Sequence, residues 1–351
     1  MNIKSSFFDF FTTSYKERTH SEIMSWILSG TCTAITEESR IYLVNKLFNV
    51  YISNIDKVTT EYNHIDVLIS TSTLNIAVEN KITSTLHSDQ LERYQQKLKE
   101  LNKTSKCFLF SFINEQPLDK NWIAISYEFY LEVLQELKLA DGLDKFFLIG
   151  YIDHLSYLVS TKAEFLNNVN TYAFVFKDGS KKKSDKHWDD YVDNTALFIA
   201  KNQLETCFQL CFLFSLCEDL RKKNVCHFTE TRGNALVDIH FTNRVFDKTK
   251  GKYDVFLQIQ GCNIKFAFSS TKYDTSKRSA ISNEIKIMQQ LQSQNDFGYS
   301  KINGPKSKAY VSMSKKMPKA YWEMDKKEFE RYIENEVKNV HLLVDSLVSK
   351  M

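Results

Sequence analysis

The sequence predicts an α/β protein whose mixed β-sheet is covered by helices on both faces, followed by a C-terminal α+β region. Three short segments rich in β-branched residues, at 54–62, 64–71 and 75–82, follow one another with polar turns between them, which is typical of a strand meander. Helical patterns precede and follow these strands, and an apolar run at 106–113 returns to strand character. The resulting order of helix, three strands, helix, strand and helix indicates a sheet between helical layers.

The first half of the chain supplies these elements in a regular order. Its expected helices lie at 15–28, 39–52, 88–102, 125–140 and 146–169. The helix at 88–102 has Ser88 or Asp89 as its N-cap candidate. We expect this half, residues 1–176, to form one domain, and a lysine-rich linker to follow at 177–186.

The second half, residues 187–351, has a different pattern. Residues 188–224 predict one long helix, and alternating segments predict an antiparallel sheet with further helices. The expected strands lie at 235–242, 253–260, 263–270 and 309–314, and the expected helices at 282–294 and 325–350. We expect this domain to recognise substrate, to oligomerise or to regulate.

Composition excludes several classes of protein. The 351 residues are 43% hydrophobic and 25% charged, as in ordinary soluble proteins, and they allow about two domains. With no apolar run long enough to span a membrane and no signal-peptide pattern, we expect a cytoplasmic protein. Seven cysteines, an odd number in a large chain, predict reduced thiols, and Cys207 and Cys211 fit core packing better than a metal site.

The stretch "AVENKI", residues 77–82, places Glu79 and Lys81 two positions apart in an apolar strand, so both side chains lie on one face. Burying two charges is costly unless they are paired or bind something. The same three-residue pattern occurs at Glu136/Lys138, Glu284/Lys286, Asp325/Lys327 and Glu336/Lys338. Those pairs lie in expected helices, where positions i and i+2 face different ways, so the strand context selects Glu79 and Lys81.

Asp66 lies in the preceding strand and can meet Glu79 across the sheet. Two neighbouring carboxylates repel and need a cation, and oxygen ligands without histidine or thiolate suit Mg²⁺ or Mn²⁺. Lys81 could position or deprotonate a water molecule on the metal, the nucleophile of phosphodiester hydrolysis. Gln90 and Tyr94 share one face of the following helix and can hold a phosphate or orient Lys81; the alternative is a capped surface helix with Tyr94 half-buried.

The segments "HIDVLI", "AVENKI" and "DQLERY", in this order, resemble the PD-(D/E)XK nuclease superfamily and its RecB-like branch in particular. With "ERTHSEIMSWIL" and "CFLFSFI", the chain is similar over residues 15–140 to a bacterial PDDEXK-like family. The resemblance implies a restriction-endonuclease-like core and makes Asp66 and Glu79 the metal ligands, with the Asn80 backbone carbonyl as a further ligand. Lys81 would then activate water or stabilise charge.

The resemblance also assigns supporting residues. A glutamate of the first helix serves the metal site in this superfamily; Glu17 is the better match and Glu22 the runner-up. His20 would contact phosphate or metal-bound water, or else cap the helix. Gln90 and Tyr94 match the RecB-like helix positions. The chain departs from the family pattern in having Ile65 for the name-giving proline, Asn63 and His64 for Gly-Arg, and a loop after Trp26 without the usual proline and histidine.

The expected function is therefore a Mg²⁺-dependent nuclease, with Mn²⁺ as a substitute, that acts on DNA rather than RNA in bacterial defence against phage or foreign DNA. A homo-oligomer or an activating partner is possible in this context. Two alternatives stay open: a nucleic-acid-binding module without catalysis, and a protein in which Asp66, Glu79 and Lys81 form only a buried ion-pair cluster. The lysine-rich stretches at 177–187 and 306–319 fit phosphate contacts or solvated loops equally well.

Overall fold

The computed structural model forms two compact units, which are described separately. The first comprises Met1–Asn167 and Gly179–Cys211, and the second Asn168–Asp178 and Phe212–Met351. The structure describes residues 16–86, 90–101, 103–117, 119–178, 186, 191, 193–222, 225–231, 234–241, 253–260, 262–270, 286, 288–293, 297–299, 301–303 and 311–349.

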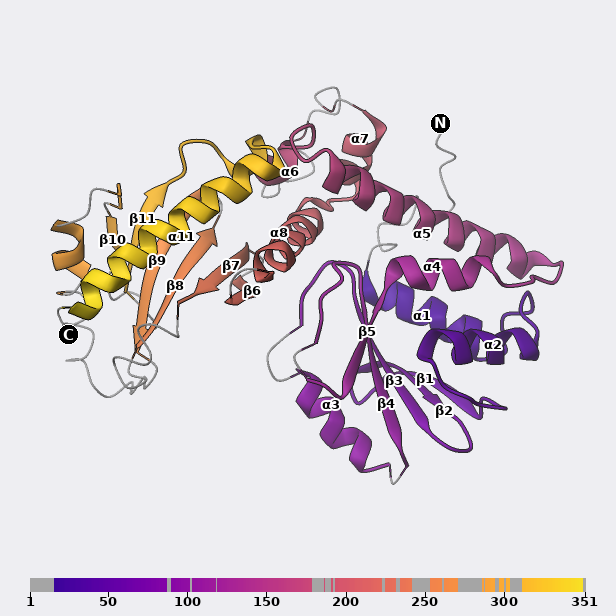
Figure 1. The fold of residues 1–351 in the computed structure, drawn as a ribbon. Coiled ribbons are helices and arrows are strands. Elements are labelled where there is room, and N and C mark those ends of the chain that lie inside the picture. The colour runs from indigo at the N-terminus through magenta and orange to yellow at the C-terminus, as the bar shows by residue number, and fades with distance from the viewer. Residues whose placement is uncertain are drawn as a thin grey trace. The chain divides into compact units, whose positions relative to one another are not determined.

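The first unit contains a five-stranded sheet in the order β1-β2-β3-β4-β5 (Figure 1). Its strands are β1 (Lys57–Tyr62), β2 (Ile65–Ser70), β3 (Asn75–Lys81), β4 (Ser105–Ser111) and β5 (Trp122–Ser126). The first three pair antiparallel as a meander, while β4 pairs parallel with both β3 and β5. The mixed sheet confirms the predicted fold class.

Helices lie on both faces of this sheet. The helices of the unit are α1 (Glu17–Leu28), α2 (Glu37–Phe48), α3 (Gln90–Lys99), α4 (Tyr127–Gln135), α5 (Leu143–Asn167) and α7 (Asn194–Lys201), of which α5 packs on α4 and α7 packs on α5. In Figure 1, α3 lies on one side of the strands and α1, α2 and α4 on the other. The α3 side buries Leu91, Tyr94 and Leu98 against Ala77 and Cys107 of the sheet. Because α3 connects the parallel strands β3 and β4, its first turn lies where β3 ends.

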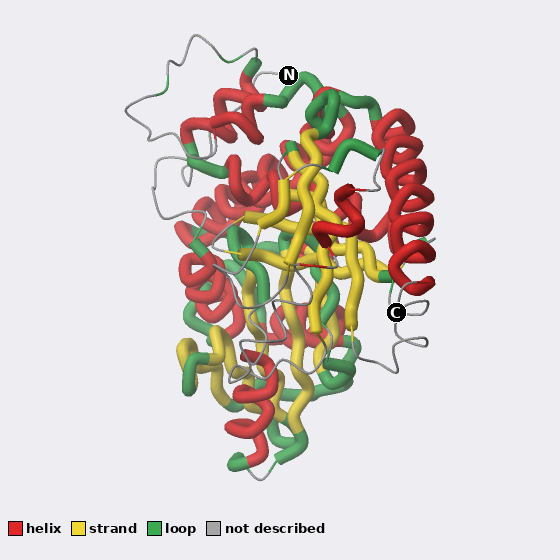
Figure 2. The backbone as a smooth tube through the Cα atoms, turned by 90° about the vertical axis from the view of Figure 1, so that its left-hand side faces the viewer, coloured by secondary structure: helices red, strands yellow, loops and turns green. Residues whose placement is uncertain are grey.

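The second unit is built on a six-stranded antiparallel sheet in the order β10-β11-β9-β8-β7-β6. The strands are β6 (Val225–Thr231), β7 (Asn234–His240), β8 (Tyr253–Gln260), β9 (Asn263–Ser270), β10 (Lys301–Asn303) and β11 (Val311–Lys316). The long helix α11 (Lys326–Ser349) lies beside these strands (Figure 2). Glu336 of α11 accepts from Lys315 at 2.6 Å and from Tyr299 at 2.9 Å. The short elements α6 (Phe174–Asp178) and η4 (Tyr321–Glu323) meet where Phe176 stacks on Trp322.

The prediction of one long helix over residues 188–224 is wrong. The chain forms α7 and then α8 (Glu205–Arg221), separated by a turn in which Gln203 adopts a left-handed φ of 56°. A left-handed residue interrupts the repeating backbone bonds of a helix, so the direction of the chain changes there. The strands β5, β6 and β10 had no predicted counterpart, and the helix expected at 125–140 begins at Tyr127, after β5.

The expected linker at 177–186 lies mostly outside the described residues and stays a prediction. Lys186 is described: its buried ammonium pairs with Glu205 and donates to the Ala200 carbonyl at 3.0 Å. The units divide inside α8, between Cys211 and Phe212. All seven cysteines are free thiols.

Within the described part of the chain, no helix is both long and apolar enough to cross a membrane.

Candidate active site

Glu79 and Lys81 form an ion pair at the end of β3, on the face that α3 covers. All seven residues of β3 are buried, and Glu79 is 2% exposed. The Lys81 ammonium lies 2.7 Å from Glu79 Oε1. The strand geometry thus places the two side chains next to each other, as positions i and i+2 require.

Asp66 lies on β2 and faces the same cluster. Its Oδ2 accepts a hydrogen bond of 2.7 Å from the backbone N–H of Asn80, between Glu79 and Lys81. Burial, together with the neighbouring Glu79 charge, raises the pKa of Asp66 to about 7. A carboxylate whose ionisation is disfavoured by a neighbouring carboxylate indicates a site with an excess of acidic groups.

The first turns of α3 complete the surroundings of Glu79. The side-chain amide of Gln90 donates to Glu79 Oε1 at 2.6 Å and to the Tyr94 hydroxyl at 2.8 Å. Burial raises the pKa of Glu79, although Lys81 offsets part of this effect. Its second oxygen, Oε2, is buried and has no hydrogen-bond partner among the residues that the structure describes.

Glu17, in the first turn of α1, reaches the end of β3 from the other side of the sheet. Its Oε2 lies 3.7 Å from the Lys81 ammonium, and its Oε1 accepts from Ser84 Oγ at 2.7 Å and from the Ile82 N–H at 3.3 Å. Burial lowers the pKa of Lys81, but Glu79 and Glu17 raise it by more, so it lies above its ordinary value. Lys81 is therefore a cation at neutral pH.

Asp66, Glu79, Lys81 and Glu17 thus meet around the end of β3. A comparison with protein families adds the decisive observation: the family model described as the PD-(D/E)XK nuclease superfamily matches residues 5–213, more than half of the chain. The chain belongs to the PD-(D/E)XK nuclease superfamily. No curated protein and no solved structure gives a significant match.

Membership in the PD-(D/E)XK superfamily implies a nuclease, hence a hydrolase with a nucleic-acid substrate. It confirms the resemblance inferred from the motifs, while the RecB-like branch and the bacterial origin stay predictions. The sequence prediction assigns the acid of the superfamily name to Asp66 and its Glu-x-Lys to Glu79 and Lys81, and this assignment stays a prediction. Their catalytic roles, and those of Glu17, Gln90 and Tyr94, stay predictions.

We call Asp66, Glu79 and Lys81 the nuclease motif. Two other predicted site residues lie apart from it. Glu22 is exposed and pairs with Arg18 at 2.8 Å, so the structure does not bring it to the carboxylates. His20 is 1% exposed; its Nδ1 lies 3.0 Å from the Tyr151 hydroxyl, and its ring packs edge-on against Tyr127. These described contacts of His20 lie in the helical layer that contains α1, α4 and α5.

Asn80 contributes through its side chain, which the sequence analysis did not foresee. Its amide is fully buried on the α1 face, where Nδ2 donates to Ser21 Oγ at 2.7 Å and Oδ1 accepts from the Tyr127 hydroxyl at 3.4 Å. Ser21 in turn donates to the Glu17 carbonyl at 3.0 Å. The hydrogen bonds therefore connect the nuclease motif to the turn of α1 that carries Glu17.

Replacing Ser21 with alanine is expected to lower the free energy of unfolding by about 1–3 kcal/mol, because the buried amide of Asn80 would lose its acceptor. Urea unfolding in EDTA measures this change. Ser29→Ala, at the exposed C-cap of the same helix, is the control and should stay within about 0.5 kcal/mol of wild type. Equal stability of the two variants would contradict the expectation.

Distant segments hold the backbone on the C-terminal side of Lys81. The N–H of Phe112 donates to the Lys81 carbonyl at 2.8 Å, and the buried Lys162 ammonium of α5 donates to the Phe112 carbonyl at 2.6 Å. The Cys207 thiol of α8 donates to the Ile82 carbonyl at 3.1 Å. These residues are far apart in sequence, so no local pattern predicts their contacts.

The donor set fits a cation that keeps part of its water shell. Among the described residues no group of three or more His, Cys, Asp or Glu side chains could hold a metal ion. Mg²⁺ binds through one or two carboxylates and waters, whereas Zn²⁺ sites use three or four protein ligands. Asp66 and Glu79 supply two carboxylates, and the buried, unpartnered Oε2 of Glu79 would gain a partner from a bound cation.

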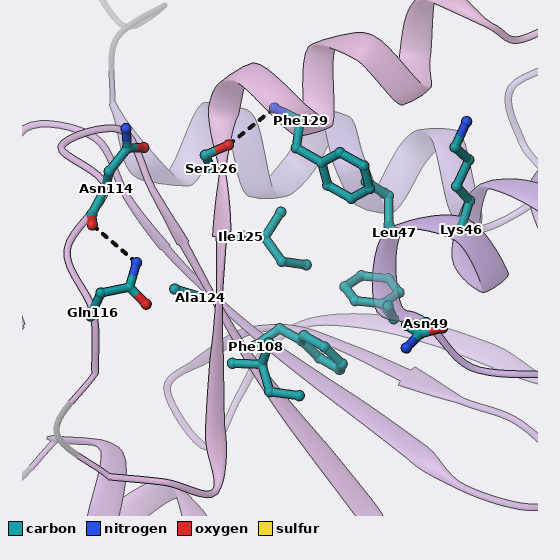
Figure 3. Close-up of a pocket in the computed structure, with 12 residues that line it drawn as sticks. Lys46, Leu47, Asn49, Phe108, Asn114, Gln116, Ala124, Ile125, Ser126 and Phe129 are labelled. Carbon is teal, nitrogen blue, oxygen red and sulfur yellow. Dashed lines mark hydrogen bonds between the residues drawn. The ribbon is translucent and has the colours of Figure 1, made fainter.

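The pocket in Figure 3 is distinct from this site. It has a volume of about 730 Å³ and lies at the β5 edge of the sheet. Figure 3 shows Phe108, Ile125 and Phe129 around it, from β4, β5 and α4. None of the predicted site residues lines this pocket.

Proposed function

We propose that this protein is a Mg²⁺-dependent deoxyribonuclease that hydrolyses phosphodiester bonds, with Mn²⁺ as a substitute metal. One observation carries the proposal: the buried Glu79 carboxylate has an unpartnered oxygen, and it lies beside Asp66 and the Lys81 cation. A buried excess of negative charge is costly unless a cation offsets it. Superfamily membership supports the same chemistry.

The residues of the site would have different roles in this reaction. Asp66, Glu79 and the Asn80 carbonyl would hold the metal, which when bound supplies Lewis acidity for phosphodiester hydrolysis. Because its pKa is raised, Lys81 remains protonated and would stabilise the negative charge that develops on the phosphoryl oxygens, rather than act as a base. Glu17 and Gln90 would keep Lys81 and Glu79 in place.

The sequence resemblance to the RecB-like branch supports DNA rather than RNA as the substrate. The same resemblance supports defence against phage or foreign DNA, in the cytoplasm of a bacterial cell, as the context. An activating partner or a homo-oligomer belongs to this part of the proposal.

The test is to incubate purified protein with supercoiled plasmid, linear DNA and single-stranded RNA in Mg²⁺, Mn²⁺ or EDTA. We expect metal-dependent DNA cleavage that Glu79→Gln abolishes. Glu136→Gln is the matched control, because Glu136 has the same three-residue pattern but is exposed and pairs with Lys46.

Cleavage in EDTA, or cleavage that survives Glu79→Gln, would refute the proposed site. Cleavage of RNA alone would correct the substrate. Binding of DNA without cleavage under any of the metals would favour the alternative, a nucleic-acid-binding module with a nuclease fold.

A further inference from the structure

A second pocket lies at the far end of α3 from the nuclease motif. It has a volume of about 490 Å³ and opens where β4 and β5 begin. Ser105 starts β4 opposite Asn75, whereas Lys81 pairs with Ser111 at the other end of the same strand. Gln90 begins α3 at the motif, and Lys99 ends it at the pocket. At 1.5 Å per residue these two positions are about 14 Å apart along the helix.

Three lysines line this pocket, and no acidic side chain does. Lys99 and Lys106 are exposed, while the Lys103 ammonium is held by the Thr71 carbonyl at 2.6 Å. The pocket, which we call the lysine pocket after Lys99, Lys103 and Lys106, is therefore positive.

An acidic residue, Asp119, lies next to the lysine pocket without lining it. Its Oδ2 accepts from the Gln95 amide at 2.5 Å, and its Oδ1 accepts from the Asn121 amide at 2.9 Å. Gln95 and Asn121 line the pocket, and both of their side-chain amides are hydrogen-bonded to this carboxylate. Glu100, which follows Lys99, is exposed and pairs with Lys97 at 3.4 Å. These two carboxylates offset the three lysines only in part.

The surroundings of the nuclease motif are acidic, in contrast to the positive lysine pocket. Glu17, Asp66 and Glu79 surround one ammonium, that of Lys81. This cluster would repel a phosphate backbone in the absence of metal, so affinity for nucleic acid must come from cations elsewhere. The lysine pocket supplies such cations at the end of the sheet where β4 begins. Lys99 ends α3, the helix on the Glu79 face, whereas Lys106 alternates with Cys107 and lies on the opposite face.

Apolar groups form the rest of the lining. Leu98 and Cys107 lie at its base, and Ile123, 52% exposed, lies at its edge. Ammonium groups beside an apolar surface suit a nucleotide unit, whose phosphate is charged and whose sugar is not. Successive phosphates of one duplex strand are about 3.4 Å apart along the axis, so 14 Å corresponds to about four nucleotides.

We propose that the lysine pocket binds the phosphate backbone of the substrate nucleic acid, about four nucleotides from the bond that is cut. The identity of this ligand rests on the proposed nuclease function. The interaction itself does not require cleavage.

The test measures binding without catalysis. A fluorescein-labelled DNA duplex is titrated with the full chain in EDTA at several NaCl concentrations, and anisotropy gives the affinity. The variant carrying Lys99→Ala, Lys103→Ala and Lys106→Ala should bind about tenfold more weakly or worse, and its slope of log affinity against log salt should fall by about two to three.

Two further variants separate charge from structure. Replacement of the same three lysines by arginine keeps the charge and should keep wild-type affinity. Lys57→Ala, Lys138→Ala and Lys145→Ala together remove the same charge from elsewhere in the first unit and should change the affinity little. Melting temperatures of all variants show whether any loss reflects unfolding.

The binding results test the role of the lysine pocket whether or not the protein cleaves DNA. Wild-type affinity and slope in the alanine variant, or an equal loss in the control, would overturn it. So would a wild-type protein that binds labelled ATP in the pocket but no duplex, because the pocket would then serve a free nucleotide. A wild-type protein that binds DNA through these lysines but never cuts it would support the inference and refute the nuclease.

Discussion

Replacing Lys81 with methionine is expected to reduce DNA cleavage by about 10²–10³-fold and to destabilise the metal-free protein by about 3 kcal/mol. Cleavage falls because the cation beside the scissile phosphate is lost. Stability falls because Glu79, which is 2% exposed, would remain buried without the ammonium that lies 2.7 Å away. Among the described residues, Gln90 would be its remaining side-chain donor. Plasmid cleavage in Mg²⁺ and urea unfolding in EDTA measure the two effects.

Lys138→Met is the matched control for this change. Lys138 belongs to a second Glu-x-Lys pattern, it is exposed, and it lies just after α4, away from β3. Both activity and stability should stay near wild type. A Lys81→Met protein as stable as wild type in EDTA would show that the ion pair does not hold Glu79 in its charged form.

Replacing Asp66 with asparagine should abolish cleavage but change stability in the opposite direction. Burial raises the pKa of Asp66 from its ordinary 3.8 to about 7. The folded protein therefore holds this proton more tightly than the unfolded chain. The stability that the proton contributes is fully present below about pH 4 and is lost as the pH rises through about 7. Asparagine does not ionise, so the Asp66→Asn protein should not lose this stability as the pH rises. Its neutral side chain also removes the repulsion between residue 66 and the Glu79 carboxylate.

The melting temperature in EDTA checks this expectation. At pH 8 the Asp66→Asn protein should melt above wild type, and the difference should shrink toward pH 5. Added Mg²⁺ should raise the melting temperature of wild type at pH 8 and leave that of the variant nearly unchanged, because only wild type keeps both carboxylates. A variant that melts below wild type at pH 8 would show that Asp66 is stabilising without metal.

The parts of the fold that could be predicted from the sequence are the segments in which hydrophobic residues recur at a regular spacing. The strands β2 and β3 and the helix α3 lie close to their expected positions, because alternation and amphipathic spacing report burial directly. The strand β5 was missed because its five residues run straight into the helix that begins at Tyr127. The break at Gln203 was missed because no glycine or proline marks it: the residue that adopts the left-handed backbone is a glutamine.

The candidate site was predictable to the extent that it depends on strand geometry. The i, i+2 rule placed Glu79 and Lys81 on one face, and the short turn after β2 placed Asp66 beside them. The side-chain contacts of Asn80 with Ser21 and Tyr127 join three elements, and no spacing within one segment encodes them.

The helix α8 has a practical consequence for making fragments of this protein. Its first turns carry Cys207, which holds the Ile82 carbonyl, and Phe208, whose ring lies 6.2 Å from that of Phe112 and 5.3 Å from that of Phe165. A recombinant fragment that ended at residue 176 would strip these groups away and leave two fully buried phenylalanines facing solvent. A recombinant fragment of the nuclease portion should therefore end after α8. If a shorter fragment is insoluble, the cause would be the absence of α8 and not an intrinsic instability of the nuclease fold.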